Sequence, residues 1–567
     1  MLRCKYTKKY LDKNGKIIAY KLVDSNNNEK RVSAINLKNK IKSKLVEVEN
    51  LRLTSDGRLI DTKRSKVENK SINIDNRMLA FNINRDFTLN DLAKAKLIGL
   101  NIVTLSDTYG NVVECIGFDK KLVIFIDDSI VRLGKLTISS DFEEIKVVGG
   151  NNLKELNYTF RSIVLRSLDL SSLNTEKLEC LDGTFTSSFI DELNLSNFKT
   201  PNLRVLSRTF SYLETNKLDL SSFDTSKVTE MDFTFTCACI KNGILDLSNF
   251  KTQNVKALYK TFYGLVVDKL DISSFDTRNV NSLEGTFGCT RLEELDLSNF
   301  DTSNVTNMHE TFCSSSINNL NISNFNTSKV TNMKSMFNLF TTHNLDLSNF
   351  DTSNVTDMSE MFNSCNIWYL NISKFNTSKV TDMNRMFYKS EIFNLSELNF
   401  DTSKVKYFDE MFLSFVCNYK LDISSFSFES ALSFRGMFRT SKIKELEMTM
   451  NRPVEIKLMF NACRIRKLKL VNFCAKPGLA FALFENADID DLDISGMDFT
   501  DISSTDEIFK SAQIYRLNAT GIKVKDKNDV FELLCRTRIT SLTISKDYIE
   551  QVESLKQRCG IQKIIYN

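Results

Sequence analysis

The sequence predicts an α/β solenoid in which short parallel strands alternate with short helices and each repeat packs on its neighbours. The pattern LDLSNFDTSNVTNMHETF at residues 295–312 returns fifty residues later as LDLSNFDTSNVTDMSEMF at residues 345–362. The chain has 567 residues, too many for one ordinary globular core, whereas a repeat array escapes that limit. Its 18 Gly and 3 Pro are too few for long flexible linkers.

The repeat is about 25 residues long and is counted here from the first Leu of each LDL-type motif, which is position zero. This Leu recurs at Leu168, Leu193, Leu218, Leu245, Leu270, Leu295, Leu320, Leu345, Leu370, Leu395, Leu421, Leu446, Leu468, Leu492, Leu517 and Leu542. These positions define about 16 repeats, and a weaker one precedes them around Ile145.

Each repeat has six apolar columns, at positions zero, +2, +5, +10, +13 and +17. One repeat supplies Leu345, Leu347, Phe350, Val355, Met358 and Phe362. The first two columns alternate with polar residues, which is strand periodicity, and the last three step by three and four, which is helix periodicity. We therefore expect one short parallel strand and one short helix in every repeat, with the Thr at +7 bonding backbone groups at the turn.

The pattern LxLSxFxTSxVTxMxxMF resembles the BspA-like leucine-rich-repeat family, in the 25-residue form of mycoplasma lipoproteins and surface proteins of low-GC bacteria. The resemblance covers about residues 145–545. It implies a leucine-rich-repeat-like solenoid that is used for binding and has no catalytic residues. It also implies a bacterial surface adhesin as one alternative function.

The two ends do not follow the repeat. We expect one or two basic α+β modules at 1–120, an N-terminal cap and degenerate first repeat at 121–167, the solenoid at 168–545 and a C-terminal cap at 546–567. The first region reads as hairpins through Asn14-Gly15, Asp56-Gly57 and residues 106–111, with helices at 32–45 and 88–100. An amphipathic helix is expected at 547–557.

Position +1 lies between two buried columns and should point outward from the sheet. It alternates Asp with Asn between residues 296 and 371, which would separate like charges on neighbouring strands. Recent duplication of a 50-residue segment explains the alternation equally well. We predict a partner-binding strip on this face, against the alternative of a merely solvated face. It comprises Asp219, Asp246, Asp271, Asp296, Asn321, Asp346, Asn371 and the neighbouring Tyr369.

Charge is unevenly distributed along the chain. Residues 1–80 hold 20 Lys and Arg against 9 Asp and Glu, which leaves +11 there and −7 on the remainder. This basic region could contact phosphates, or it could be a solvated surface. The candidate contacts are Lys8, Lys9, Lys30, Arg31, Lys38, Lys40, Lys42 and Lys44.

The sequence offers little for catalysis. It has two His, at different columns of different repeats, and no phosphate-binding loop, dinucleotide fingerprint or calcium-loop pattern. We expect no enzyme activity, no cofactor and no metal. The prediction is a protein-binding scaffold with a second contact through its basic module. The alternative is an intracellular regulator or inhibitor, encoded by a phage or mobile element, that engages a nucleic-acid-containing complex. Without a signal peptide or an 18-residue apolar run, we expect a cytoplasmic location with no membrane span, and 13 scattered Cys fit reduced thiols.

Overall fold

The computed structural model describes the strands between residues 2 and 61, and residues 92–93, 95–96, 102–241, 243–450, 454–473, 480–500 and 507–567. Side chains are described from residue 92 onward. The chain divides into two compact units, Met1–Asn279 and Val280–Asn567, and each is considered by itself.

The first compact unit opens with a six-stranded sheet in the order β3-β2-β1-β4-β5-β6. Its strands are β1 (Leu2–Leu11), β2 (Ile17–Asp24), β3 (Glu29–Ser33), β4 (Val46–Glu49), β5 (Leu51–Leu53) and β6 (Leu59–Asp61). Antiparallel pairing of β1 with β2 and of β5 with β6 confirms the strands of the two expected hairpins. Their turns lie outside the described residues, as does the helix expected at 32–45 except for its first two residues, which belong to β3 and are extended.

The rest of this unit holds a second group of strands. They are β7 (Ile102–Ser106), β8 (Val112–Phe118), β9 (Lys121–Ile126), β10 (Arg132–Leu133), β11 (Glu144–Gly149), β12 (Glu155–Leu156), β13 (Val164–Leu173), β14 (Phe189–Asn194), β15 (Glu214–Thr215), β16 (Cys239–Ile240), β17 (Ile244–Asp246) and β18 (Lys269–Asp271). β7 and β8 form the expected third hairpin, and residues 92–93 and 95–96 are helical within the helix predicted at 88–100. From β9 to β11 to β13 the pairing is parallel, with Ile145 between Leu122 and Leu168. The strand of the degenerate first repeat is therefore paired with a parallel strand on each side.

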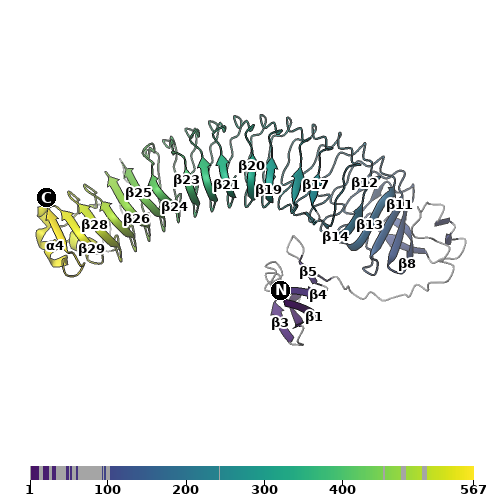
Figure 1. Ribbon diagram of the computed structural model, residues 1–567, viewed down its shortest axis with the longest axis horizontal. Helices are drawn as coiled ribbons and strands as arrows, with labels where there is room; N and C mark the ends of the chain where they lie inside the picture. Colours follow the sequence, from purple (N-terminus) through teal and green to yellow (C-terminus); the bar gives the residue numbers. More distant parts are fainter. Residues whose placement is uncertain are drawn as a thin grey trace. The chain divides into compact units, whose positions relative to one another are not determined.

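The second compact unit is dominated by one sheet in which β19 to β30 follow one another in chain order (Figure 1). Its strands are β19 (Arg291–Asp296), β20 (Ser316–Asn321), β21 (Thr341–Asp346), β22 (Asn366–Asn371), β23 (Glu391–Leu395), β24 (Val416–Leu421), β25 (Lys442–Thr449), β26 (Arg464–Val471), β27 (Asp488–Asp493), β28 (Gln513–Ala519), β29 (Arg538–Ile544) and β30 (Lys563–Tyr566). Its helices are α3 (Asp529–Leu534), η2 (Lys546–Tyr548) and α4 (Ile549–Leu555). The amphipathic helix expected at 547–557 is α4, which buries Val552 and Leu555.

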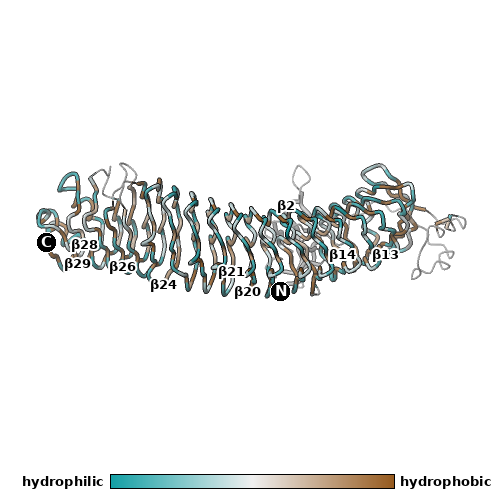
Figure 2. Tube along the Cα trace, turned by 90° about the horizontal axis from the view of Figure 1, so that it is seen from above, coloured by the Kyte–Doolittle hydropathy of each residue, from teal (hydrophilic) through white to brown (hydrophobic). Residues whose placement is uncertain are grey.

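The repeats form a β-solenoid, with about 17 turns in the chain as a whole. The predicted register is confirmed, because Leu295 pairs directly with Leu320 and Leu345 with Leu370. The strands, however, begin four residues before position zero and end at +1, as β19 does. Hydrophobic and hydrophilic residues alternate along each turn (Figure 2), so every turn contributes side chains both to the core and to the surface.

The prediction of one helix per repeat is wrong. The segment from +13 to +20 is a succession of tight turns, in which Thr311 N donates to Met308 O while Phe312 N donates to Met336 O of the next turn. Glu310 and Ser314 adopt positive φ angles of 54° and 59°, which a right-handed helix excludes. The fold is therefore a β-solenoid and not an α/β solenoid, and the three-and-four spacing of apolar residues reflects turns that aim Val305, Met308 and Phe312 inward.

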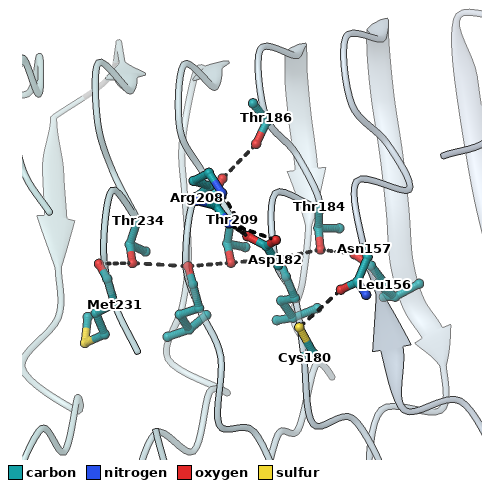
Figure 3. A network of polar contacts seen from close by, with 12 residues as sticks. Leu156, Asn157, Cys180, Asp182, Thr184, Thr186, Arg208, Thr209, Met231 and Thr234 are labelled. Carbon is teal, nitrogen blue, oxygen red and sulfur yellow. Dashed lines mark hydrogen bonds and ion pairs between the residues drawn. The ribbon is translucent and has the colours of Figure 1, made fainter. Parts of the chain in front are cut away.

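Two columns hold the stacked turns together from inside. The Phe at +17 forms stacked rings along the core, as in Phe312, Phe337 and Phe362, with centroids 5.4 and 5.7 Å apart. In the first unit, the buried Thr at +16 extends its hydroxyl to the preceding turn: Thr209 donates to Leu181 O at 2.9 Å and Thr234 to Leu206 O at 3.1 Å (Figure 3). These bonds link neighbouring turns at carbonyls that also accept a backbone N–H within their own turn.

Candidate binding face on the strand ladder

The outer face of the ladder follows from the strand pattern. In β19, β21 and β22 the residues at −3 and zero are buried, whereas those at −4, −2 and −1 are exposed. Position +1 is exposed at Asp296 and Asp346. Because the strands are parallel and in register, each exposed position becomes a column of side chains about 4.8 Å apart.

In the second unit, the alternation of Asp with Asn produces direct bonds between neighbouring strands. Asn321 Nδ2 donates to Asp296 Oδ1 at 2.8 Å, and Asn371 Nδ2 donates to Asp346 Oδ1 at 2.9 Å. Backbone N–H of Ser298 also donates to Asp296. The Ser298 amide and hydroxyl, with the Asn321 amide, hold the pKa of Asp296 below its usual value despite partial burial. An Asn in every second turn thus replaces a repulsion with a hydrogen bond.

In the first unit, Asn does not alternate with Asp along the strip, because Asp219, Asp246 and Asp271 follow one another. Asp246 and Asp271 pair directly across β17 and β18, so two carboxylates lie on neighbouring strands. Hydrogen bonds from the hydroxyl and backbone N–H of Ser248 hold the pKa of Asp246 below its usual value, against the opposing charge of Asp219.

An exposed aromatic column lies beside the strip; the sequence pointed to Trp368 and Tyr369 as possible anchors for a partner but not to the column as a whole. It consists of His343, Trp368 and Phe393, all at −2 on β21, β22 and β23. Neighbouring rings stack with centroid distances of 5.8 Å for His343–Trp368 and 4.9 Å for Trp368–Phe393. Trp368 is 48% exposed and Tyr369, the next residue, is 40% exposed. The signal was a 25-residue spacing of rings in a column whose residue type otherwise varies, so column-by-column inspection of −2 would have found it.

The basic candidates cannot be placed as contacts. Lys8 and Lys9 belong to β1, and Lys30 and Arg31 belong to β3, but their side chains are not among those described. Lys38, Lys40, Lys42 and Lys44 lie outside the described residues altogether.

Cysteines occupy buried or half-buried positions beside the turns. Cys115, Cys365, Cys417 and Cys463 are buried free thiols. Cys365 replaces a Ser in one column, with its Sγ 2.7 Å from Phe337 O, and burial raises the pKa of its thiol. Such thiols behave as small apolar side chains.

Two further points concern metal sites and membrane-spanning helices among the described residues. No cluster of three or more His, Cys, Asp or Glu in this part of the chain is placed to hold a metal ion. Among the same residues, every helix falls short of the length and apolarity that a bilayer crossing requires.

Comparison with known proteins gives one family. No curated protein and no solved structure matches the chain. A family model described as "Mycoplasma protein of unknown function, DUF285" matches three times, at residues 151–266, 259–366 and 339–452. These overlapping matches follow the repeats and together cover just over half of the sequence. The chain therefore belongs to the DUF285 family of repeat proteins.

Proposed function

We propose that this protein is a non-enzymatic scaffold that binds a protein partner on the exposed strand face of its solenoid. The observation that carries the proposal is the aromatic column of His343, Trp368 and Phe393, exposed beside Tyr369 and the polar strip. Large exposed rings cost free energy in water and are the residue type that most often anchors protein interfaces. The surrounding Asp and Asn side chains would supply a hydrogen-bonding rim.

The rim has few positive charges near the rings, which favours a partner with basic or amide-rich side chains. Asp296 and Asp346 keep their carboxylates exposed and accept bonds from neighbours that are themselves fixed in the ladder. A fixed carboxylate loses little side-chain entropy when a Lys or Arg of a partner arrives. The strip is thereby preorganised for charge-assisted bonds.

The finer family assignment is part of the same proposal. The resemblance to BspA-like leucine-rich-repeat proteins rests on the apolar columns, and the repeated DUF285 matches are compatible with it. This resemblance implies binding as the general role. A surface adhesin and a regulator that contacts a nucleoprotein through the basic N-terminal region are the two alternatives to a protein-binding scaffold.

The test is affinity capture from the native host with the full chain as bait. A double variant, Asp296→Lys with Asp346→Lys, and a ring variant, Trp368→Ala with Tyr369→Ala, should each reduce the captured partner at least tenfold. The matched control is Asp301→Lys with Asp351→Lys, because these residues occupy the same turns and also accept a backbone N–H two residues on, but at position +6. Equal loss in the control, or no loss in both test variants, would refute binding on this face.

A further inference from the structure

A cluster of positive charge lies on the same face of the second unit, three strands beyond Trp368. Lys442 and Lys444 on β25, with Arg464 and Arg466 on β26, line a hollow of about 400 Å³ together with Cys417, Asn418 and Ile443. These four side chains are the basic patch. No carboxylate belongs to the described lining, so the hollow is a site of concentrated positive potential.

The basic patch is only partly neutralised. Arg464 lies 3.5 Å from Asp488, and its side chain is still 74% exposed. Lys442, Lys444 and Arg466 are exposed, and none of them forms an ion pair with another described side chain. Cations that line a hollow without carboxylate partners are available to bind an anion from solution.

A strand with several carboxylates lies on each side of the region that holds the aromatic column and the basic patch. β19 carries Glu293, Glu294 and Asp296 on its exposed positions, and β27 carries Asp488, Asp490 and Asp491. Between them, the −2 and −1 columns of β20 to β24 hold amides, rings and one lysine. On β25, Glu445 at position −1 places a carboxylate in these two columns. The exposed surface from the aromatic column on β21 to the basic patch on β26 is called the track. It lies between two strands, β19 and β27, whose carboxylates repel phosphates.

The distance along this track suits an extended chain. From β21, which carries His343, to β26, which carries Arg466, there are five strand intervals, or about 24 Å. His343 and Phe393 stack on the two faces of Trp368, so the rings at one end offer their exposed edges to bases, and the cations at the other end offer partners for phosphates. Aromatic side chains beside a positive groove are the pattern by which proteins bind single-stranded nucleic acid.

We propose that the track from β21 to β26 binds a short single-stranded nucleic acid. Bases contact Trp368 and Phe393, and phosphates bind the basic patch. A duplex is disfavoured because its bases are stacked inside and cannot reach the rings. The carboxylates of β19 and β27 limit the footprint by repelling phosphates. This ligand uses the same rings as the protein partner proposed above, so the two compete for them, but the oligonucleotide titration is performed without that partner.

The test uses the full chain and a fluorescein-labelled ten-residue oligothymidylate, followed by anisotropy and by the emission of the lone Trp. Binding should quench Trp368, and its affinity should fall as salt rises. Lys444→Glu with Arg466→Glu should weaken binding at least tenfold and lower the salt slope by about 1.4, because two phosphate contacts are lost. Trp368→Leu should weaken binding at least fivefold.

The controls separate this site from other basic surfaces. Lys329→Glu with Lys379→Glu makes the same charge change at position +9, where each lysine is bonded to an Asn of the preceding turn, and should leave the affinity within twofold. If changing Lys38, Lys40, Lys42 and Lys44 to Glu abolishes binding while Lys444→Glu with Arg466→Glu does not, the track is not the site. Equal quenching by heparin, polyglutamate or a duplex of the same length would also overturn the proposal. Circular dichroism and the unfolding midpoint verify that each variant is folded.

Discussion

At the scale of the residue, the Thr at +7 shows how a turn is fixed to its neighbour. Thr352 is fully buried. Its hydroxyl donates to Asn376 O at 2.9 Å and accepts from Asn376 N at 2.8 Å. One side chain therefore pairs both the N–H and the C=O of one residue in the next turn, at a partly buried position. The sequence prediction that this column bonds backbone groups at the turn is confirmed.

Replacing Thr352 with Val keeps the shape of the side chain and removes both hydrogen bonds. Because a partly buried N–H and C=O of Asn376 lose their partner, we expect a loss of about 1 kcal/mol in the free energy of unfolding. Chemical denaturation, followed by circular dichroism, measures the change. Thr356→Val is the matched control, since Thr356 is exposed and makes only a 3.4 Å bond to Thr331 O, and it should change stability by less than about 0.5 kcal/mol. Equal effects of the two substitutions would contradict this role.

At the scale of the element, the turn wall from +13 to +20 replaces the helix that the sequence predicts. Backbone N–H groups there alternate between bonds within a turn and bonds to the next turn. Residues at +15 and +19 adopt positive φ angles, including Glu360 at 58° and Ser364 at 55°. Each turn therefore carries two left-handed residues, and its hydrogen bonds tie it to its neighbour.

Substitution of Ser364 tests this backbone conformation. Val is β-branched and strongly disfavoured at positive φ, so Ser364→Val should destabilise the protein by about 1–2 kcal/mol. Ser364→Gly should be nearly neutral, because Gly adopts this φ without steric cost. In a helix the order would be reversed, with Gly the more harmful residue. Denaturation midpoints of the two variants decide between a turn and a helix.

Much of each repeat could be predicted from its sequence, and the helix error has a physical origin. Apolar columns and a constant length fixed the register, as the pairing of Leu295 with Leu320 confirms. Spacing by three and four is shared by helices and by successive tight turns, so periodicity alone could not separate them. Gly183, Gly264 and Gly436 were a usable signal, because each stands at +15 or +19 with positive φ and Gly is unfavourable inside a helix.

At the scale of the whole molecule, both compact units use the same device of a buried strand pattern with one exposed polar face. The position of the polar strip could be predicted, because +1 lies between buried columns. The aromatic column and the basic patch are not part of the repeated motif, because −4 and −2 carry different residue types from turn to turn, and finding them requires inspection of each column separately. Binding sites on such a face are therefore built from the residues that depart from the repeat.

The central claim is that successive repeats stack in register and present position +1 side by side on an exposed face. Asp346 and Asn371 are paired across β21 and β22, so their Cα atoms should be about 4.8 Å apart, within the range for a disulfide. The double variant Asp346→Cys with Asn371→Cys should form that bond on mild oxidation, measured as a mass loss of about 2 Da. Asp346→Cys with Ser396→Cys spans two strand intervals, about 10 Å, and should not. Absence of the first cross-link, or equal formation of both, would contradict the account.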